Sequence, residues 1–96
     1  MIVQFVQFET ALTEEEVVAV ANARLPQFRA IPGLVQKYYL ADTEPGYFGG
    51  FYLWRSIDDV QQYRESELAA TIASAYEGIG APEVRVFEIV MPLRDD

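Results

Sequence analysis

Apolar residues recur with two different periods along the chain, and these periods divide it into strands and helices. Residues 2–9, IVQFVQFE, carry apolar side chains on both faces and predict a strand that is covered on both sides. The segments LVQKYYLA, at 34–41, and GGFYLWR, at 49–55, predict two more strands, with a turn-rich connection between them that suggests a hairpin. A last strand, EVRVFEIVM, is expected after Pro82.

A first helix is predicted after the first strand. Thr13 and Glu16 have the spacing of a capping box, and the three consecutive glutamates here suit the positive first turn of a helix. Pro26 should kink the helix or split off its last turn, and Ile31-Pro32-Gly33 should end the segment. The inward side is expected to carry Val17, Val20 or Ala21, the stem of Arg24, and Phe28.

A second helical region is predicted from Ser56, which can cap it together with Asp59. The apolar spacing loosens at RESE, so we expect a break and a new start near Ser66. Gly78 and Gly80 should end this region. Its inward positions are Val60, Tyr63, Leu68, Ile72 and Tyr76, and we interpret Tyr63 and Tyr76 as packing residues.

The predicted order β-α-β-β-α-β is that of a ferredoxin-like α+β fold, formed by one domain over residues 1–96. In this fold the helices cover only one face of the sheet, yet the strands here are substantially apolar on both faces. A chain of 96 residues without cysteine also buries only a modest part of its surface. We therefore expect a homodimer in which the second face of each sheet is buried.

Two glycines, Gly49 and Gly50, precede the aromatic residues of the third strand. Glycine weakens a strand, so it usually marks a bulge or a close approach to the backbone. The approaching group is expected to be a ligand or a second chain. Alternation places Tyr52 and Trp54 on one face and Phe51 on the other, together with Leu53.

Charge and composition exclude several functions. Seven basic and fifteen acidic residues give a net charge of -8, which disfavours binding to nucleic acids and anionic membranes. No apolar run approaches the roughly 20 residues of a membrane span, and no signal peptide is evident, so a cytoplasmic protein is expected. Without histidine, cysteine or a glycine-rich phosphate loop, we expect no haem, flavin or metal.

The ordered set PGL, Lys37 and Tyr39, GGFYLW, Tyr63, VFE, and Pro92-Leu93 resembles the YdhR-type family of putative monooxygenases. That family belongs to the dimeric α+β barrel superfamily, with the antibiotic-biosynthesis monooxygenases. The resemblance covers nearly the whole chain. It departs from the family pattern in a shorter connection before Pro32 and in Leu34 and Gln36, where the family often has larger aromatics.

The resemblance implies a barrel of two sheets across a two-fold axis, with Gly49 and Gly50 bending the third strand into its wall and Pro32-Gly33 forming a structural turn. It favours the face of Lys37, Val35 and Tyr39 for a cavity. We assign Phe51 and Leu53 to the helices, which leaves Tyr52 and Trp54 for the cavity. The alternative for Tyr39, Tyr52 and Trp54 is packing in the dimer core, and the alternative for Lys37 is a solvated position at the rim. Asn22 and Arg24 are expected at the surface.

The function implied by this resemblance is cofactor-independent oxygenation of a small aromatic or polyketide-like molecule. Lys37 would stabilise the substrate anion, or act as a base, in a pocket that lowers its pKa. Tyr39, Tyr52 and Trp54 would position the ligand. Two alternatives use the same cavity: a non-oxidative isomerase or cyclase, and a ligand-binding module without turnover.

Overall fold

The computed structural model describes residues 1–95, and within them strands and helices follow the predicted ferredoxin-like order. The four strands form one antiparallel sheet in the order β2-β3-β1-β4, which confirms the α+β fold class. The elements are β1 (Ile2–Glu9), α1 (Glu14–Arg29), β2 (Leu34–Ala41), β3 (Tyr47–Trp54), α2 (Ile57–Arg64), α3 (Glu67–Ala70), α4 (Ile72–Ala75) and β4 (Glu83–Glu88).

Capping side chains begin the helices where the sequence predicts. Thr13 Oγ1 accepts from the Glu16 amide at 3.2 Å, while Glu16 Oε1 accepts from the Thr13 amide at 2.9 Å. Ser56 caps α2, and the predicted break at Ser66 is confirmed because its hydroxyl caps the separate helix α3. Of the two predicted effects of Pro26, the splitting off of a last turn does not occur, since α1 continues through Pro26 to Arg29, and the kink stays a prediction.

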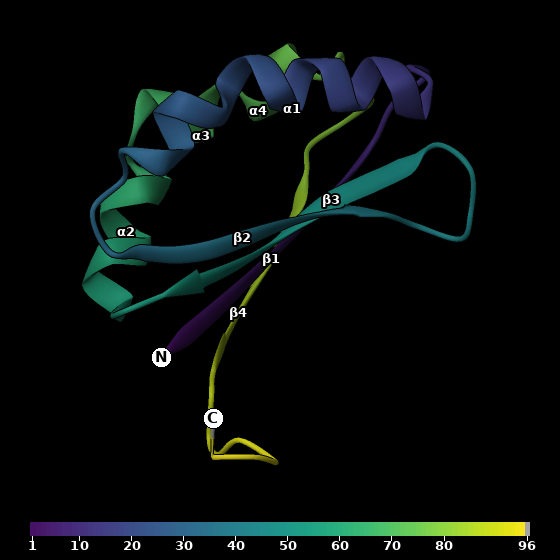
Figure 1. The fold of residues 1–96 in the computed structure, drawn as a ribbon. Helices are drawn as coiled ribbons and strands as arrows, with labels where there is room; N and C mark the ends of the chain where they lie inside the picture. The colour runs from purple at the N-terminus through teal and green to yellow at the C-terminus, as the bar shows by residue number, and fades with distance from the viewer. Residues whose placement is uncertain (96) are drawn as a thin grey trace.

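All helices lie on one side of the sheet, and the opposite side is covered by no helix within residues 1–95 (Figure 1). Side chains of β1 and β3 alternate between a buried and a half-buried position, so the two faces are clearly distinguished. The core lies between the sheet and the helices, and its buried apolar members are Val6, Phe8, Val17, Phe28, Phe48, Tyr52, Trp54, Val60, Tyr63, Ile72 and Tyr76.

The predicted orientation of β3 is wrong. Tyr52 and Trp54 point towards the helices, where the ring of Trp54 lies 5.2 Å from that of Tyr63 of α2. Phe51 and Leu53 take the opposite, open face, where Phe51 pairs with Phe5 of β1. Both sets of residues are apolar enough to be buried, and for that reason alternation alone could not tell which face the helices cover.

The chain itself fills the space that Gly49 and Gly50 leave open. A Cβ at Gly49 would collide with the backbone carbonyl of Val6 on β1, and a Cβ at Gly50 would lie 3.1 Å from Lys37 Cε and 2.8 Å from the ring of Tyr52. Neither a ligand nor a second chain is needed to explain these glycines. Gly50 instead provides room for Lys37.

Pro32 and Gly33 form the tight turn between α1 and β2. The amide of Leu34 donates to the carbonyl of Ile31 at 3.4 Å, and Gly33 has a φ of 81°. Proline followed by a glycine with positive φ is the pattern of a type II turn. A side chain at Gly33 would also collide with the carboxylate of Asp59, so the turn requires glycine for two reasons.

Candidate active site

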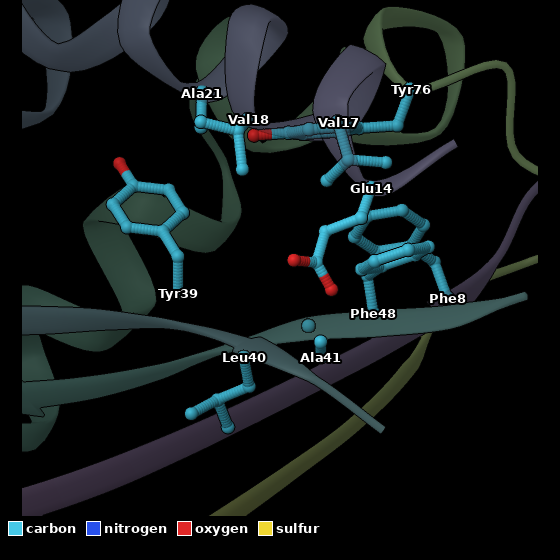
Figure 2. Close-up of a pocket in the computed structure, with 11 residues that line it drawn as sticks. Phe8, Glu14, Val17, Val18, Ala21, Tyr39, Leu40, Ala41, Phe48 and Tyr76 are labelled. Carbon is cyan, nitrogen blue, oxygen red and sulfur yellow. The ribbon is translucent and has the colours of Figure 1, made fainter. Parts of the chain in front are cut away.

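Two hollows open between α1 and the strands β2 and β3, one on each side of Tyr39. In Figure 2 the ring of Tyr39 stands between β2 and α1, while Leu40 points the opposite way, to the open face of the sheet. The first hollow, of about 160 Å³, is the one drawn there, and the carboxylate of Glu14 projects into it from α1. Phe8, Phe48 and Tyr76 form its far wall.

The second hollow, called here the Lys37 hollow, has a volume of about 280 Å³. It lies beneath the last turns of α1, beside the edge strand β2. A bulge between Leu34 and Gln36 shifts the register of β2 against β3 at this point. The hollow is lined by Leu25, Phe28, Arg29, Leu34, Val35, Gln36, Lys37 and Tyr39.

The amine of Lys37 is surrounded by aromatic rings. Its Nζ lies 3.5 Å from the ring centre of Phe28, 4.3 Å from that of Tyr39 and 4.5 Å from that of Tyr52. The three rings come from α1, β2 and β3, which means that the packing of the helix on the sheet creates this environment. Lys37 and Tyr39 share one side of β2, as predicted, but this side faces the helices, whereas the prediction had assigned Phe51 and Leu53 to the helices.

This environment changes the acidity of Lys37. Ring faces attract a cation and so favour the protonated amine. Removal from water disfavours it, and the positive charge of Arg24 acts in the same direction. Burial, the larger of these two causes, and the charge of Arg24 lower the pKa of Lys37 to about 7. Lys37 can therefore gain or lose a proton near neutral pH.

Arg24 of α1 is a member of the site that the sequence did not predict. Its Nη2 donates to Thr71 Oγ1 at 2.8 Å and to the carbonyl of Leu68 at 3.2 Å, and its guanidinium lies 5.8 Å from the ring centre of Phe28. The expectation of a plain surface role is therefore wrong. Its position in the apolar stripe of α1 was a usable signal, because an arginine buried by its stem needs partners for its head group.

The tyrosines around the site keep their protons at neutral pH, so their hydroxyls are hydrogen-bond donors. Burial raises the pKa of Tyr39 and Tyr63, raises the pKa of Tyr76 to about 12, and raises the pKa of Tyr52 well above its ordinary value. The hydroxyls of Tyr52 and Tyr63 lie 3.3 Å apart and share a hydrogen bond. Among these groups Lys37 alone has a pKa near 7, and it is therefore the candidate base.

Tyr52 and Trp54 support the site from beneath. Their rings are parallel with centres 6.1 Å apart, and their side chains are 1% and 0% exposed. The indole nitrogen of Trp54 donates to Gln4 Oε1 at 3.0 Å. Tyr52 contacts the amine of Lys37, whereas Trp54 lies one ring further from it and lines neither hollow beside Tyr39. The residues that the structure brings together are thus Lys37, Tyr39 and Tyr52, joined by Phe28 and Arg24.

No group of His, Cys, Asp and Glu residues with the arrangement of a metal site occurs within residues 1–95. In the same part of the chain, no helix is both long and apolar enough to cross a membrane. The site described above consists of an amine, a guanidinium, phenols and aromatic rings.

A four-stranded antiparallel sheet with helices on one side and a site beneath them defines a ferredoxin-like α+β protein. Comparison with known proteins identifies the family. Residues 2–95 match the family described as "Putative mono-oxygenase ydhR", and the chain belongs to that family. The resemblance noted in the sequence is thereby confirmed. No curated protein matches the chain.

Solved structures share this fold at low sequence identity. A protein of unknown function from Nitrosomonas europaea superposes with a TM-score of 0.77 and 20% identity, over 99% of this chain and 94% of its own. SnoaB, a cofactor-independent oxygenase from Streptomyces nogalater, gives 0.76 and 19%, over 98% of each chain. A putative antibiotic biosynthesis monooxygenase from Deinococcus radiodurans gives 0.75 and 11%, over 98% and 97%.

Proposed function

We propose that this protein is a cofactor-independent oxygenase that acts on a small phenolic or enolic molecule in the Lys37 hollow. The membership of a monooxygenase family and the fold shared with SnoaB support the class of reaction. The observation that carries the assignment is the amine of Lys37, enclosed by three rings beside Arg24, with no carboxylate among the groups that shift its pKa.

Two neighbouring cations with no acidic partner within residues 1–95 favour an anionic ligand. This arrangement is unusual in a chain of net charge -8, where carboxylates are plentiful. A phenolate or enolate would supply the missing negative charge, and its ring would lie against Tyr39, which is 40% exposed. The protonated hydroxyl of Tyr39 would donate a hydrogen bond to an oxygen atom of the ligand.

The reaction needs a base and an anion-binding group, and Lys37 supplies both in turn. The neutral amine takes the proton of the phenol, and the resulting ammonium stabilises the phenolate. A ring carbon of this anion reacts with dioxygen, which is the co-substrate, to give a hydroperoxide. Loss of water then leaves a carbonyl group, so that a phenol and dioxygen yield a quinone and water. Tyr39 holds the ring in place, while Tyr52 and Trp54 form the buried floor beneath the amine.

Oxygen uptake with electron-rich phenols tests this proposal. We expect consumption to depend on phenol and protein, and kcat/KM to rise with pH around 7 as Lys37 loses its proton. Lys37→Met should remove at least about 99% of the rate, which is the usual scale of a general base. Arg55→Lys, at an exposed position, is the matched control and should retain full activity.

Other outcomes would contradict the proposal in different ways. Conversion of the phenol without oxygen uptake would replace it with a non-oxidative isomerase or cyclase. Saturable binding without any conversion would replace it with a ligand-binding module. Soaking crystals with a panel of small aromatic ligands would then show which residues contact the ligand.

We also propose that the protein is a homodimer in which the open faces of two sheets meet. The open face carries large apolar side chains from every strand, and helices of the same chain lie on the other side. Tyr38 is 55% and Phe87 is 46% exposed. A second copy of this face would cover both residues and close the barrel that is typical of the fold superfamily.

A further inference from the structure

The chain contains a single lysine. Lys37 occupies the aromatic enclosure, and every other basic side chain is an arginine: Arg24, Arg29, Arg55, Arg64, Arg85 and Arg94. Arginine keeps its proton under all ordinary conditions, whereas a buried lysine can lose it and become a nucleophile. The only side-chain amine of this protein therefore lies in the aromatic enclosure, where it can lose its proton near neutral pH.

The surroundings of this amine are those of a reactive lysine. An amine is made nucleophilic by an apolar pocket or by a neighbouring cation, and Lys37 has both. Arg24 cannot move away easily, because Thr71 and Leu68 fix its guanidinium. Gly50 reserves the space of the lysine stem, since a Cβ there would lie 3.1 Å from Cε.

We propose that Lys37 is a carbonyl-binding amine, which condenses with a small aromatic aldehyde or ketone in the Lys37 hollow to form an imine. Nζ attacks the carbonyl carbon and gives a carbinolamine. The carbonyl oxygen then leaves as water, with the two hydrogens that the amine loses. The step needs no oxidant or reductant, so it goes beyond the proposed oxygenase reaction and can be tested without oxygen.

The lining of the hollow favours one class of carbonyl compound. A flat ring fits against Tyr39, which is 40% exposed, and a volume of about 280 Å³ is large enough for one substituted ring. Arg29 lines the same hollow from an exposed position and can attract a carboxylate. We therefore choose 4-carboxybenzaldehyde as the probe, with benzaldehyde as the neutral comparison.

The rate of imine formation depends on pH through the ionisable groups around the amine of Lys37. Between pH 6 and 9 the tyrosines around it stay protonated and the arginines stay charged, and Lys37 is the group that changes. These groups are Arg24 of α1, whose charge acts on the amine, Arg29 of α1 and Tyr39 of β2, which line the same hollow, and Tyr52 of β3, whose ring contacts the amine and whose hydroxyl pairs with Tyr63 of α2.

The experiment traps the imine by reduction. Protein and 4-carboxybenzaldehyde are incubated at pH 7 with cyanoborohydride under nitrogen, and the adduct is located by peptide mass spectrometry. The free fraction of an amine falls tenfold for each unit by which its pKa exceeds the pH, which at pH 7 favours Lys37 over an ordinary lysine by about 1,000-fold. Lower basicity and restricted access offset part of this gain, so we expect labelling at Lys37 to be about 10- to 100-fold faster than at an ordinary exposed lysine. Benzaldehyde should react at the same residue, but more slowly.

A variant with one lysine elsewhere provides the matched reference. Lys37→Met combined with Arg55→Lys places the only lysine at an exposed position, and its labelling rate defines the ordinary value. Equal rates at positions 37 and 55 would overturn the proposal, and so would labelling confined to the amino terminus of the wild type. If the double variant fails to fold, the Met1 amine of the wild type serves as the reference. Faster labelling at Lys37 than at Met1 would then support the proposal, and slower labelling would overturn it. Oxygen uptake plays no part in this readout, so the two proposals fail separately.

Discussion

At the scale of single residues, the burial of Lys37 has a cost that depends on pH. The pKa of its amine is about 7 in the folded protein and 10.5 in an ordinary lysine. Because the folded pKa is lowered, the unfolded chain binds the additional proton between these values, and stability rises with pH across this window. The full cost is present below pH 7 and is relieved as the pH approaches 10.5.

Lys37→Met is therefore expected to stabilise the protein at pH 6, by about 2 kcal/mol or more, because each unit of pKa shift corresponds to about 1.4 kcal/mol. The gain should become smaller between pH 7 and pH 9, and it should be followed by urea unfolding of both proteins. The upper limit of pH 9 avoids ionisation of tyrosines in the unfolded chain. A gain that does not change with pH would mean that the amine is not perturbed.

Trp54 belongs to the hydrophobic core and does not line the Lys37 hollow. It is fully buried, its ring packs with those of Tyr52 and Tyr63 in a cluster of three, and its indole nitrogen donates to Gln4 Oε1. Trp54→Ala should lower the free energy of unfolding by about 3–5 kcal/mol, the usual cost of deleting a buried large aromatic ring. Val90→Ala, at a side chain that is 92% exposed, is the control and should change it by less than about 0.5 kcal/mol. A mild effect of Trp54→Ala in thermal unfolding would contradict this role in the core.

The sequence predicted the residue types of the site better than their surroundings. Lys37 and Tyr39 could be placed on one face of β2 by alternation, and the structure agrees. Phe28 was recognised as buried, but its position over the amine depends on how α1 crosses the sheet, and no local pattern encodes that angle. The same holds for Arg24, whose partners lie more than forty positions away along the chain.

At the scale of elements, local sequence signals were sufficient to predict where helices begin. The serine and threonine caps predicted the starts of α1, α2 and α3, because capping depends on residues only three positions apart. The facing of β3 could not be predicted in this way. Phe51 and Leu53 are as apolar as Tyr52 and Trp54, and the deciding interactions are with distant helices and, in our proposal, with a second chain.

The adjacent glycines of β3 should respond differently to the same substitution. Gly49→Ala places a methyl group against the backbone of Val6, which cannot move without disturbing β1, so a loss of about 2 kcal/mol or more is expected. Gly50→Ala meets side chains, which can shift, and its cost should be smaller. It should nevertheless displace the lysine stem and slow labelling of Lys37. Urea unfolding and labelling of the two variants, compared side by side, would contradict this account if Gly50→Ala were the more destabilising.

At the scale of the whole molecule, a single chain leaves the apolar side chains of the open face of the sheet exposed to water. Tyr38, Leu40 and Phe87 remain exposed on it while the helices are engaged on the other side. Exposed apolar surface of this extent is typical of a protein interface. An interface between two such faces should bury more than about 1,200 Å² in total.

Phe87→Asp should convert the proposed dimer into a monomer, because each chain would bury a carboxylate in the interface without a partner. Light scattering coupled to size-exclusion chromatography measures the mass directly. Ile79→Asp removes a similarly exposed apolar residue at the end of the helical region, away from the open face, and should leave the dimer intact. A wild-type monomer at micromolar concentration would refute the assembly.

The stack beneath the lysine also gives the protein an intrinsic optical signal. Trp54 is the only indole in the chain, it is shielded from water, and one tyrosine ring separates it from the amine of Lys37. Its fluorescence should be that of an apolar environment, and it should receive excitation energy from Tyr52 and Tyr63. A ligand that enters the Lys37 hollow and shifts Tyr52 would change this emission, so binding can be followed on the unmodified protein without any added dye.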